Sequence, residues 1–211
     1  MSPSVHFFMG GFAVHLNHET NIHNLFAVGE CASMYHGANR LGGNSLLAAM
    51  YSGEIAAGEI AARAGGGYVP DFSAFIQKES VLLKKRQESQ SLFPVMYIRD
   101  MVAKSMNQDL GIIRTESSLD AGLADVDYYL SVADRIHYDG SVSMYTNYSV
   151  AAILTLAKAT LLCARFRKES RGSHYRSDYP SSRKDHAYAT IISYNHGECQ
   201  MRLDKEHEYE R

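Results

Sequence analysis

Apolar residues recur with a helical period in the stretch 44–64. Leu46, Met50, Gly53, Ala57, Ile60, Ala61 and Ala64 follow one another at intervals of three, four or one, which places them on one face of a helix. Most of that face is Gly or Ala, so the helix can lie close to another backbone or to a flat ligand. Three glycines at 65–67 predict its end.

The second half of the chain carries charged, amphipathic helical patterns. Asp71, Pro94 and Thr115 each precede one such pattern and predict where a helix begins. The first pattern places Phe72, Phe75, Ile76, Leu82 and Leu83 on or near one face of its helix. The expected inward positions of the other two are Ile98, Met101, Val102 and Ser105; then Leu119, Leu123, Val126, Leu130, Ala133 and His137. These three helices with short links predict an antiparallel bundle. A fourth helix is expected from Thr146 or Asn147 to about Arg167.

Four short stretches have strand patterns. Residues 5–9 and 25–30 predict strands near the start of the chain, the second one buried and ending in Glu30. Residues 186–194 and 198–203 flank Asn195-His196-Gly197 and predict a hairpin. We therefore expect a mostly helical α+β protein with three parts. These are 1–65, a piece of an α/β domain; 66–145, a three-helix bundle; and 146–211, a helix, a polar segment and the hairpin.

Composition narrows the classes of function. The chain has 211 residues and a formal net charge of −2, which gives no electrostatic footprint for nucleic acid. It has no run of 18 apolar residues, so we expect no membrane span, and its first residues do not resemble a signal peptide. Its three cysteines lack CxxC spacing, which favours ordinary thiols in a reduced cytoplasm and predicts no metal site.

The densest chemical signal is the stretch His36-Gly37-Ala38-Asn39-Arg40-Leu41-Gly42-Gly43-Asn44-Ser45-Leu46-Leu47. It predicts a glycine-rich turn that leads into a helix, with Asn44 or Ser45 as the cap. Free N–H groups and the positive end of the helix dipole suit a ligand with negative charge. Arg40 stands just before this end, and its guanidinium matches a carboxylate bidentately. Taken alone, Arg40 would instead be interpreted as half of a surface or structural salt bridge.

Several stretches together resemble the flavoprotein subunit of succinate dehydrogenase and fumarate reductase, a family that includes L-aspartate oxidase. The stretch from His36 to Leu47 is similar to the family signature almost letter for letter. His6-Phe7-Phe8-Met9-Gly10-Gly11, residues 25–31, 112–115 and Glu169-Ser170-Arg171-Gly172-x-His174 resemble further family segments in the correct order. Leu41-Gly42-Gly43 favours the succinate/fumarate group over aspartate oxidases.

The resemblance implies FAD as cofactor and a C-terminal part of an enzyme that moves a hydride between flavin N5 and a dicarboxylate. It implies that Arg40 and His6 bind a substrate carboxylate and that Glu30 accepts hydrogen bonds from the FAD ribose. It places Asn44, Ser45 and Leu46 beside the flavin, where a helix dipole favours a reduced, negatively charged ring. Each has a plainer interpretation: His6 as a structural histidine, Glu30 as a solvated strand end, Ser45 and Leu46 as an ordinary helix entry. His36 fits equally well as a site residue or as a residue that stabilises the turn.

The resemblance also implies missing parts. The chain has no GxGxxG turn for the FAD pyrophosphate, and it lacks the capping domain that supplies the family's proton donor. We therefore expect an enzyme portion that is inactive alone, with no catalytic residue of its own. Its partners would be succinate or fumarate, the missing FAD-binding and capping domains, an electron-transfer subunit or a second copy of itself. It would reside in the cytoplasm and reach a membrane face through partner subunits. The alternatives are a non-catalytic helical docking module and an L-aspartate oxidase-type enzyme.

Overall fold

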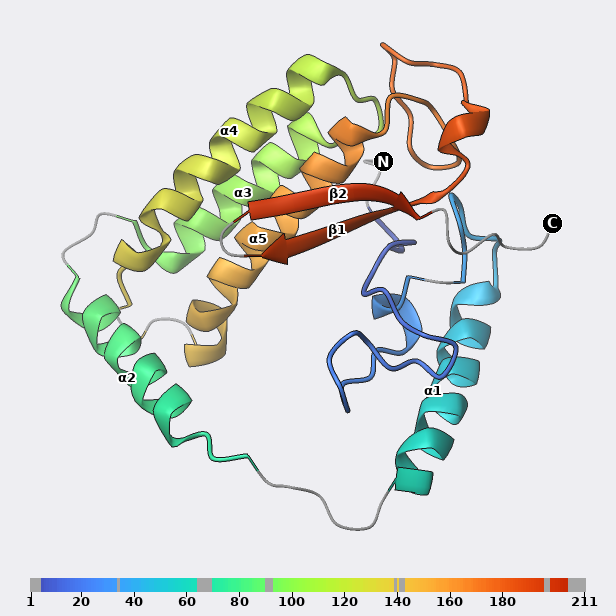
Figure 1. Ribbon diagram of the computed structural model, residues 1–211. Coiled ribbons are helices and arrows are strands. Elements are labelled where there is room, and N and C mark those ends of the chain that lie inside the picture. The colour runs from blue at the N-terminus through green and yellow to red at the C-terminus, as the bar shows by residue number, and fades with distance from the viewer. Residues whose placement is uncertain are drawn as a thin grey trace. The chain divides into compact units, whose positions relative to one another are not determined.

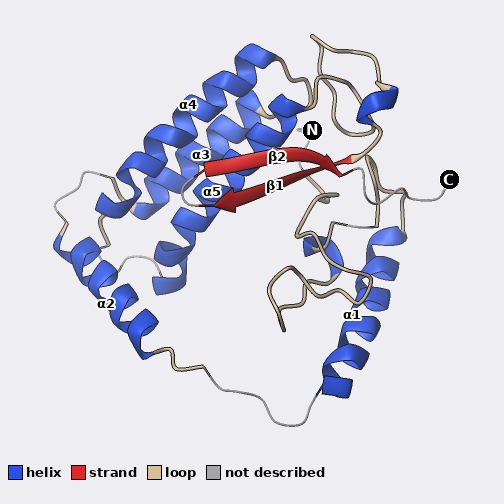
Figure 2. Ribbon diagram, viewed as in Figure 1, coloured by secondary structure: helices blue, strands red, loops and turns tan. Residues whose placement is uncertain are grey.

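A computed structural model describes residues 5–33, 35–63, 70–89, 93–138, 140, 143–195 and 198–204. The chain divides into two compact units, 1–69 and 70–211. Figure 1 shows the elements in order: η1 (Gly29–Cys31), α1 (Asn44–Arg63), α2 (Ser73–Glu88), α3 (Val95–Asp109), α4 (Glu116–Val132), η2 (Ala133–Arg135), α5 (Met144–Phe166), η3 (Lys184–His186), β1 (Ala189–Asn195) and β2 (Glu198–Asp204). Helices dominate and one hairpin lies near the C-terminus (Figure 2), so the expected mostly helical α+β class is confirmed.

The first unit consists of an irregular segment and α1. The predicted strands at 5–9 and 25–30 are wrong: residues 5–9 are irregular, and 25–30 makes one bridge, Glu19 to Phe26, before the turn η1. A strand needs a ladder of hydrogen bonds to a neighbour, and within the described residues this segment has isolated bonds such as Ala27 N–H to the His18 carbonyl, 3.1 Å.

Helix α1 forms where the sequence predicts it, but it buries a different face. Its buried residues are Ala48, Ser52 and Ala56, at intervals of four, whereas Leu46 and Met50 are exposed. Ala48, Ser52 and Ala56 are small, and α1 packs with this unit's turn η1. The close packing therefore uses the small residues Ala48, Ser52 and Ala56, which lie outside the predicted set of positions.

The core of the second unit joins α3, α4 and α5. Helix α3 begins after Pro94, and α4 begins at the Thr115 cap, where the Thr115 hydroxyl accepts from Ser118 N–H and the Ser118 hydroxyl accepts from Thr115 N–H. Both starts were predicted. The fully buried core residues are Ile98, Leu119, Val126, Leu154 and Leu161, which come from all three helices. Helix α5 therefore completes the core, so the helices within 66–145 do not form it by themselves.

Helix α2 has one buried residue, Arg86, and its side chain attaches the helix to α5 and η2. Arg86 donates from Nη1 to the Asn147 carbonyl at 3.1 Å and to Asn147 Oδ1 at 2.8 Å, and from Nη2 to the Ala133 carbonyl at 3.4 Å. Phe72, Phe75 and Ile76, which the sequence places on or near one face of this helix, are all exposed. A buried guanidinium with backbone acceptors, rather than an apolar stripe, fixes the C-terminal end of α2.

The hairpin lies across α5, as Figure 1 shows. Its strands pair antiparallel with Asn195 opposite Glu198, in the predicted hairpin, whose turn at 196–197 lies outside the described residues. Helix α5 is the one described helix long and apolar enough to cross a membrane by length and composition. One face of it packs Val150, Leu154 and Leu161 into the core of this unit.

Candidate functional site

The segment 6–8 brings the two principal predicted site residues together. The ring of Phe7 lies under the guanidinium of Arg40, with the Arg40 carbon Cζ 4.6 Å from the ring centroid. The next residue, Phe8, donates its backbone N–H to Glu30 Oε1 at 2.8 Å. His6 immediately precedes them and is exposed. Two adjacent residues, Phe7 and Phe8, therefore connect the proposed substrate contact Arg40 with the proposed cofactor contact Glu30.

Among the described residues, the Arg40 side chain has few hydrogen-bond partners. Its Nη1 donates to the carbonyl of its neighbour Leu41 at 3.1 Å. Its Nε is buried and has no hydrogen-bond partner among the described residues. No carboxylate of the described residues forms an ion pair with Arg40. A buried donor without an acceptor is costly, so this guanidinium is suited to an anionic ligand that supplies one.

Glu30 is presented by a tightly held turn. Gly29 has a φ of +66°, which favours glycine, and its N–H donates to the buried Ser52 hydroxyl on α1 at 2.8 Å. On the other side, Phe12 N–H donates to the Cys31 carbonyl at 2.7 Å. A Cβ at Gly11 would lie 2.3 Å from that carbonyl oxygen, so this close approach requires glycine. Both contacts fix the turn, and one Glu30 oxygen has no hydrogen bond to the described backbone.

The N-terminus of α1 has the character of an anion site. Gly43, with a φ of +84°, directs the chain into the helix, and Asn44 N–H donates to the Leu41 carbonyl at 3.3 Å. The first turn contains no acidic residue. Asn44 and Ser45 are half-buried and Leu46 is exposed, so the free backbone N–H groups of this turn are open to a ligand with negative charge.

Sequence reasoning missed an aromatic cluster around His36. The rings of Phe7 and His36 meet edge to face with centroids 5.2 Å apart, and Tyr35 lies beside both His36 and His18. His18 is buried, and burial lowers its pKa although a hydrogen bond to the Ala27 carbonyl opposes this. The Tyr35 hydroxyl and a His18 ring nitrogen form a short hydrogen bond. The aromatic residue after His6 was the available signal for this cluster.

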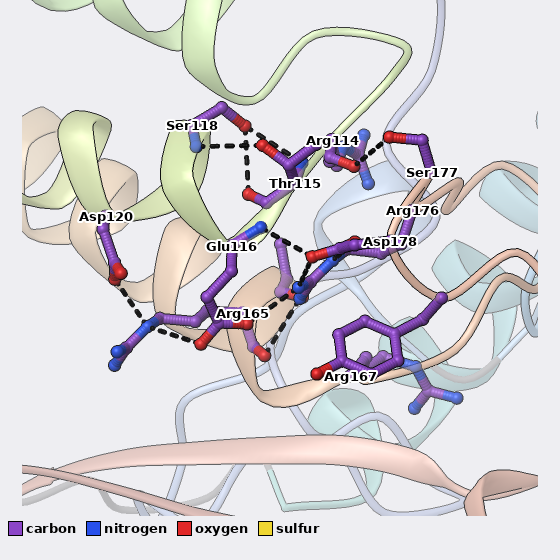
Figure 3. A network of polar contacts seen from close by, with 12 residues as sticks. Arg114, Thr115, Glu116, Ser118, Asp120, Arg165, Arg167, Arg176, Ser177 and Asp178 are labelled. Atoms are coloured by element: carbon purple, nitrogen blue, oxygen red, sulfur yellow. Dashed lines mark hydrogen bonds and ion pairs between the residues drawn. The ribbon is translucent and has the colours of Figure 1, made fainter.

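A second polar cluster lies in the second unit and is saturated with partners (Figure 3). Arg176 is fully buried and donates to Asp178 from Nε at 2.8 Å, to Glu116 Oε2 from Nη2 at 2.8 Å, and to the Ala164 carbonyl at 3.3 Å. The hydrogen bond from Arg176 lowers the pKa of Asp178 to about 2. Asp178 also accepts from Glu116 N–H at 2.8 Å, at the start of α4. This arrangement fastens the C-terminal segment to α4 and leaves Arg176 no capacity for a ligand.

Glu169 and His174 complete the second cluster. Burial alone would raise the pKa of Glu169, but hydrogen bonds from Arg171, from Arg183 N–H and from Arg167 lower it. His174 Nδ1 lies 2.8 Å from Arg114 Nη1, and its Nε2 lies 3.2 Å from the Arg167 carbonyl. Because arginine can only donate, Nδ1 accepts and the imidazole is neutral. Burial lowers the pKa of His174 to about 4. This segment is therefore packed and hydrogen-bonded within the second unit, with Glu169 and Asp178 paired to its arginines.

The comparisons with known proteins match both units. A family model described as "Fumarate reductase flavoprotein C-term" matches residues 99–208, more than half of the chain, and one described as "FAD binding domain" matches residues 1–46. The chain belongs to the succinate dehydrogenase/fumarate reductase flavoprotein family. The recognition made from the motifs is confirmed, and FAD is the cofactor of this family.

The relatives give the extent of the match. The chain is 36% identical to the fumarate reductase flavoprotein subunit of Haemophilus influenzae, over 92% of this chain and 34% of that protein. It is 33% identical to the L-aspartate oxidase of Pyrococcus furiosus, over 91% of this chain and 34% of that protein. Its structure is similar to FrdA of the Escherichia coli quinol fumarate reductase, with a TM-score of 0.81, 29% identity, and coverage of 95% of this chain and 36% of that chain. The chain thus spans about a third of the length of these relatives.

Proposed function

We propose that this chain is the C-terminal portion of an FAD-dependent oxidoreductase that interconverts succinate and fumarate. The observation that supports this most strongly is Arg40, whose Nε is buried without an acceptor among the described residues. It stands in the family signature, stacked on the segment that carries His6. Arg40 binds one carboxylate of the substrate, and His6, which is exposed and directly precedes Phe7 in the chain, donates a hydrogen bond to a carboxylate oxygen.

The chain's contribution to the cofactor site fits FAD. Glu30 accepts hydrogen bonds from ribose hydroxyls with the oxygen that Phe8 N–H does not occupy. Asn44, Ser45 and Leu46 direct the N-terminus of α1 at the flavin pyrimidine ring, where the helix dipole favours negative charge. The bound flavin supplies N5 as the hydride donor or acceptor. The chain's own residues bind, orient and stabilise charge.

The remaining parts of the site come from the rest of the family's fold. Leu41, Leu46, Leu47 and Met50 are exposed around the glycine-rich turn, a group of apolar residues that an adjoining domain would cover. We propose that FAD-binding and capping domains provide this cover together with the proton donor. An electron-transfer subunit would be a further partner and would hold the assembly at the cytoplasmic face of a membrane, since the similar E. coli structure is a quinol fumarate reductase.

Two other functions have specific support. The exposed apolar residues of α1 also fit a docking module without catalysis, whose partner covers the same surface. The relative from P. furiosus supports an L-aspartate oxidase-type reaction, in which Arg40 would bind a carboxylate of aspartate. In the docking alternative Arg40 needs no dicarboxylate, and in the oxidase alternative aspartate replaces succinate.

A flavin titration tests the cofactor half of the proposal. We expect FAD to bind the chain weakly or not at all when it is alone, and tightly when the FAD-binding and capping domains are joined to it. In the joined protein, Glu30→Gln should weaken FAD binding, whereas Glu54→Gln, an exposed glutamate of α1, should not. Tight stoichiometric FAD binding by the chain alone would contradict the proposal that it forms only a part of the FAD site. Equal affinities of the two variants would contradict the role of Glu30.

A further inference from the structure

The ring of Phe7 occupies the centre of the candidate site. One face of the ring carries the Arg40 guanidinium at 4.6 Å, within the range of a cation–π interaction. The His36 ring meets Phe7 edge to face, with centroids 5.2 Å apart and planes at 78°. Phe7 is half-buried, whereas its neighbour Phe8 is exposed. The Phe7 ring therefore contacts Arg40 and His36, whereas the ring of the adjacent Phe8 is exposed to solvent.

The position of Phe7 is itself fixed by the backbone. Phe8 N–H donates to Glu30 Oε1 at 2.8 Å, and Phe12 N–H donates to the Cys31 carbonyl at 2.7 Å. The segment that carries the Phe7 ring is thus attached at two points to the turn η1. An arginine side chain has several rotatable bonds, and holding it in one conformation without a support costs entropy. A flat ring fixed at one face of the guanidinium lowers that cost before any ligand arrives.

The hydrogen-bonding pattern shows what this support leaves available. An aromatic face attracts the cation without using an N–H donor, unlike a carboxylate partner, which would occupy two donors. Arg40 gives one side-chain hydrogen bond to the Leu41 carbonyl, and its Nε has no acceptor among the described residues. Phe7 therefore orients the guanidinium without occupying any of its N–H donors.

We propose that Phe7 is the positioning residue of the carboxylate-binding site, holding Arg40 on its ring so that the free guanidinium edge receives a carboxylate. The inference rests on the proposed function for the identity of the ligand, a small dicarboxylate, but the stacking can be tested without it. Phe7 acts through Arg40, whose guanidinium lies over its ring. Its loss should raise KM for the dicarboxylate and leave kcat nearly unchanged, because a carboxylate contact is made equally in ground and transition state.

The test uses three variants of the chain. Phe7→Leu removes the aromatic face and keeps an apolar side chain, Phe7→Tyr keeps the face, and Phe8→Leu is the matched control on the exposed neighbour. In NMR spectra of the arginine side chains, the Arg40 N–H protons should be shifted upfield by the ring current of Phe7. We expect this shift in the unaltered chain, in Phe7→Tyr and in Phe8→Leu, and its loss in Phe7→Leu. An unchanged Arg40 signal in Phe7→Leu would overturn the proposal.

Malonate, a dicarboxylate that cannot be reduced to a product, tests the ligand. Titrated into the same samples, it should move the Arg40 signals, and Phe7→Leu should need roughly tenfold more malonate, the effect of a partly desolvated cation–π contact. An Arg40 signal that does not respond to malonate, or equal affinities in Phe7→Leu and Phe8→Leu, would overturn the proposal. Normal malonate binding without redox activity in the assembled enzyme would contradict the proposed function and leave the positioning role of Phe7 intact.

Discussion

Replacing Asp178 by Asn should destabilise the second unit, and the structure allows the size of this effect to be worked out. Asp178 accepts from Arg176 Nε at 2.8 Å, from Arg176 Nη2 at 2.6 Å and from Glu116 N–H at 2.8 Å. These bonds lower the pKa of Asp178 from 3.8 to about 2. A shift of this size corresponds to roughly 2.4 kcal/mol of preference for the folded state.

Two considerations modify that figure. The Asp178 side chain is 29% exposed, so solvent screens part of the interaction and lowers the expected cost of Asp178→Asn to about 1–2 kcal/mol. The fully buried Arg176 keeps Glu116 as a partner, so the substitution does not leave its charge alone. The contribution of Asp178 is present above the unfolded pKa of 3.8 and is lost as the pH falls toward 2, because the folded pKa is the lower one.

Urea unfolding at pH 7, followed by circular dichroism, measures this effect. The matched control is Asp185→Asn, which breaks an ion pair with Arg183 of the same 2.6 Å length, but between side chains that are 64% and 47% exposed. We expect a clear decrease in the unfolding midpoint for Asp178→Asn and a much smaller one for Asp185→Asn. If the two variants unfold at the same urea concentration, the buried Arg176 cluster does not stabilise the fold in the way described.

Three further substitutions test other parts of the structure. Burial lowers the pKa of His174 from 6.5 to about 4, so between these pH values the unfolded chain takes up a proton at His174 that the folded chain resists, and the free energy of unfolding falls by up to about 3 kcal/mol. His174→Gln should remove this part of the pH dependence. If the urea midpoint of the variant falls with pH as steeply as that of the unaltered protein, the reasoning is refuted. Leu154→Ala, in the core, should cost about 2–5 kcal/mol in unfolding free energy, whereas the exposed Leu156→Ala should cost under roughly 0.5 kcal/mol. Gly11→Ala should loosen the Phe12–Cys31 hydrogen bond and speed hydrogen exchange at the Phe12 amide. Gly10→Ala should not, because its added Cβ meets nothing within 4 Å. Equal exchange rates of the Phe12 amide in the two variants would contradict the requirement for glycine at position 11.

The sequence predicted those parts of the fold whose signals are local. Thr115 and Pro94 mark helix starts through their own backbone and side-chain chemistry, and the hairpin follows from alternation around a short turn. The segment 25–30 was mispredicted because a strand forms only where a second strand pairs with it, and the residues of the segment do not show whether such a strand is present. Arg86 was not singled out, since a charged residue in an amphipathic pattern is normally solvated, whereas here it is buried against the Asn147 carbonyl.

The candidate site was predictable to a different degree. Arg40, Glu30 and His6 were found through motifs, and their roles stay predictions. What the motifs could not give is the physical connection between them. Phe7 lies in an irregular segment, so no periodicity indicates where its ring points, and its contact with Arg40 spans 33 positions of the chain. The Phe8 N–H contact with Glu30 likewise depends on the folded path of the backbone.

Fumarate reduction with a reduced viologen dye tests the central claim most directly. The assay compares the chain alone with the chain joined to the FAD-binding and capping domains, each with Arg40→Lys and with Arg135→Lys, an exposed arginine of the second unit, as control. We expect activity in the joined protein alone, abolished by Arg40→Lys and retained in Arg135→Lys. Absence of activity in the joined protein, or full activity of its Arg40→Lys variant, would contradict the assignment of Arg40 as the carboxylate-binding residue of a fumarate-reducing enzyme.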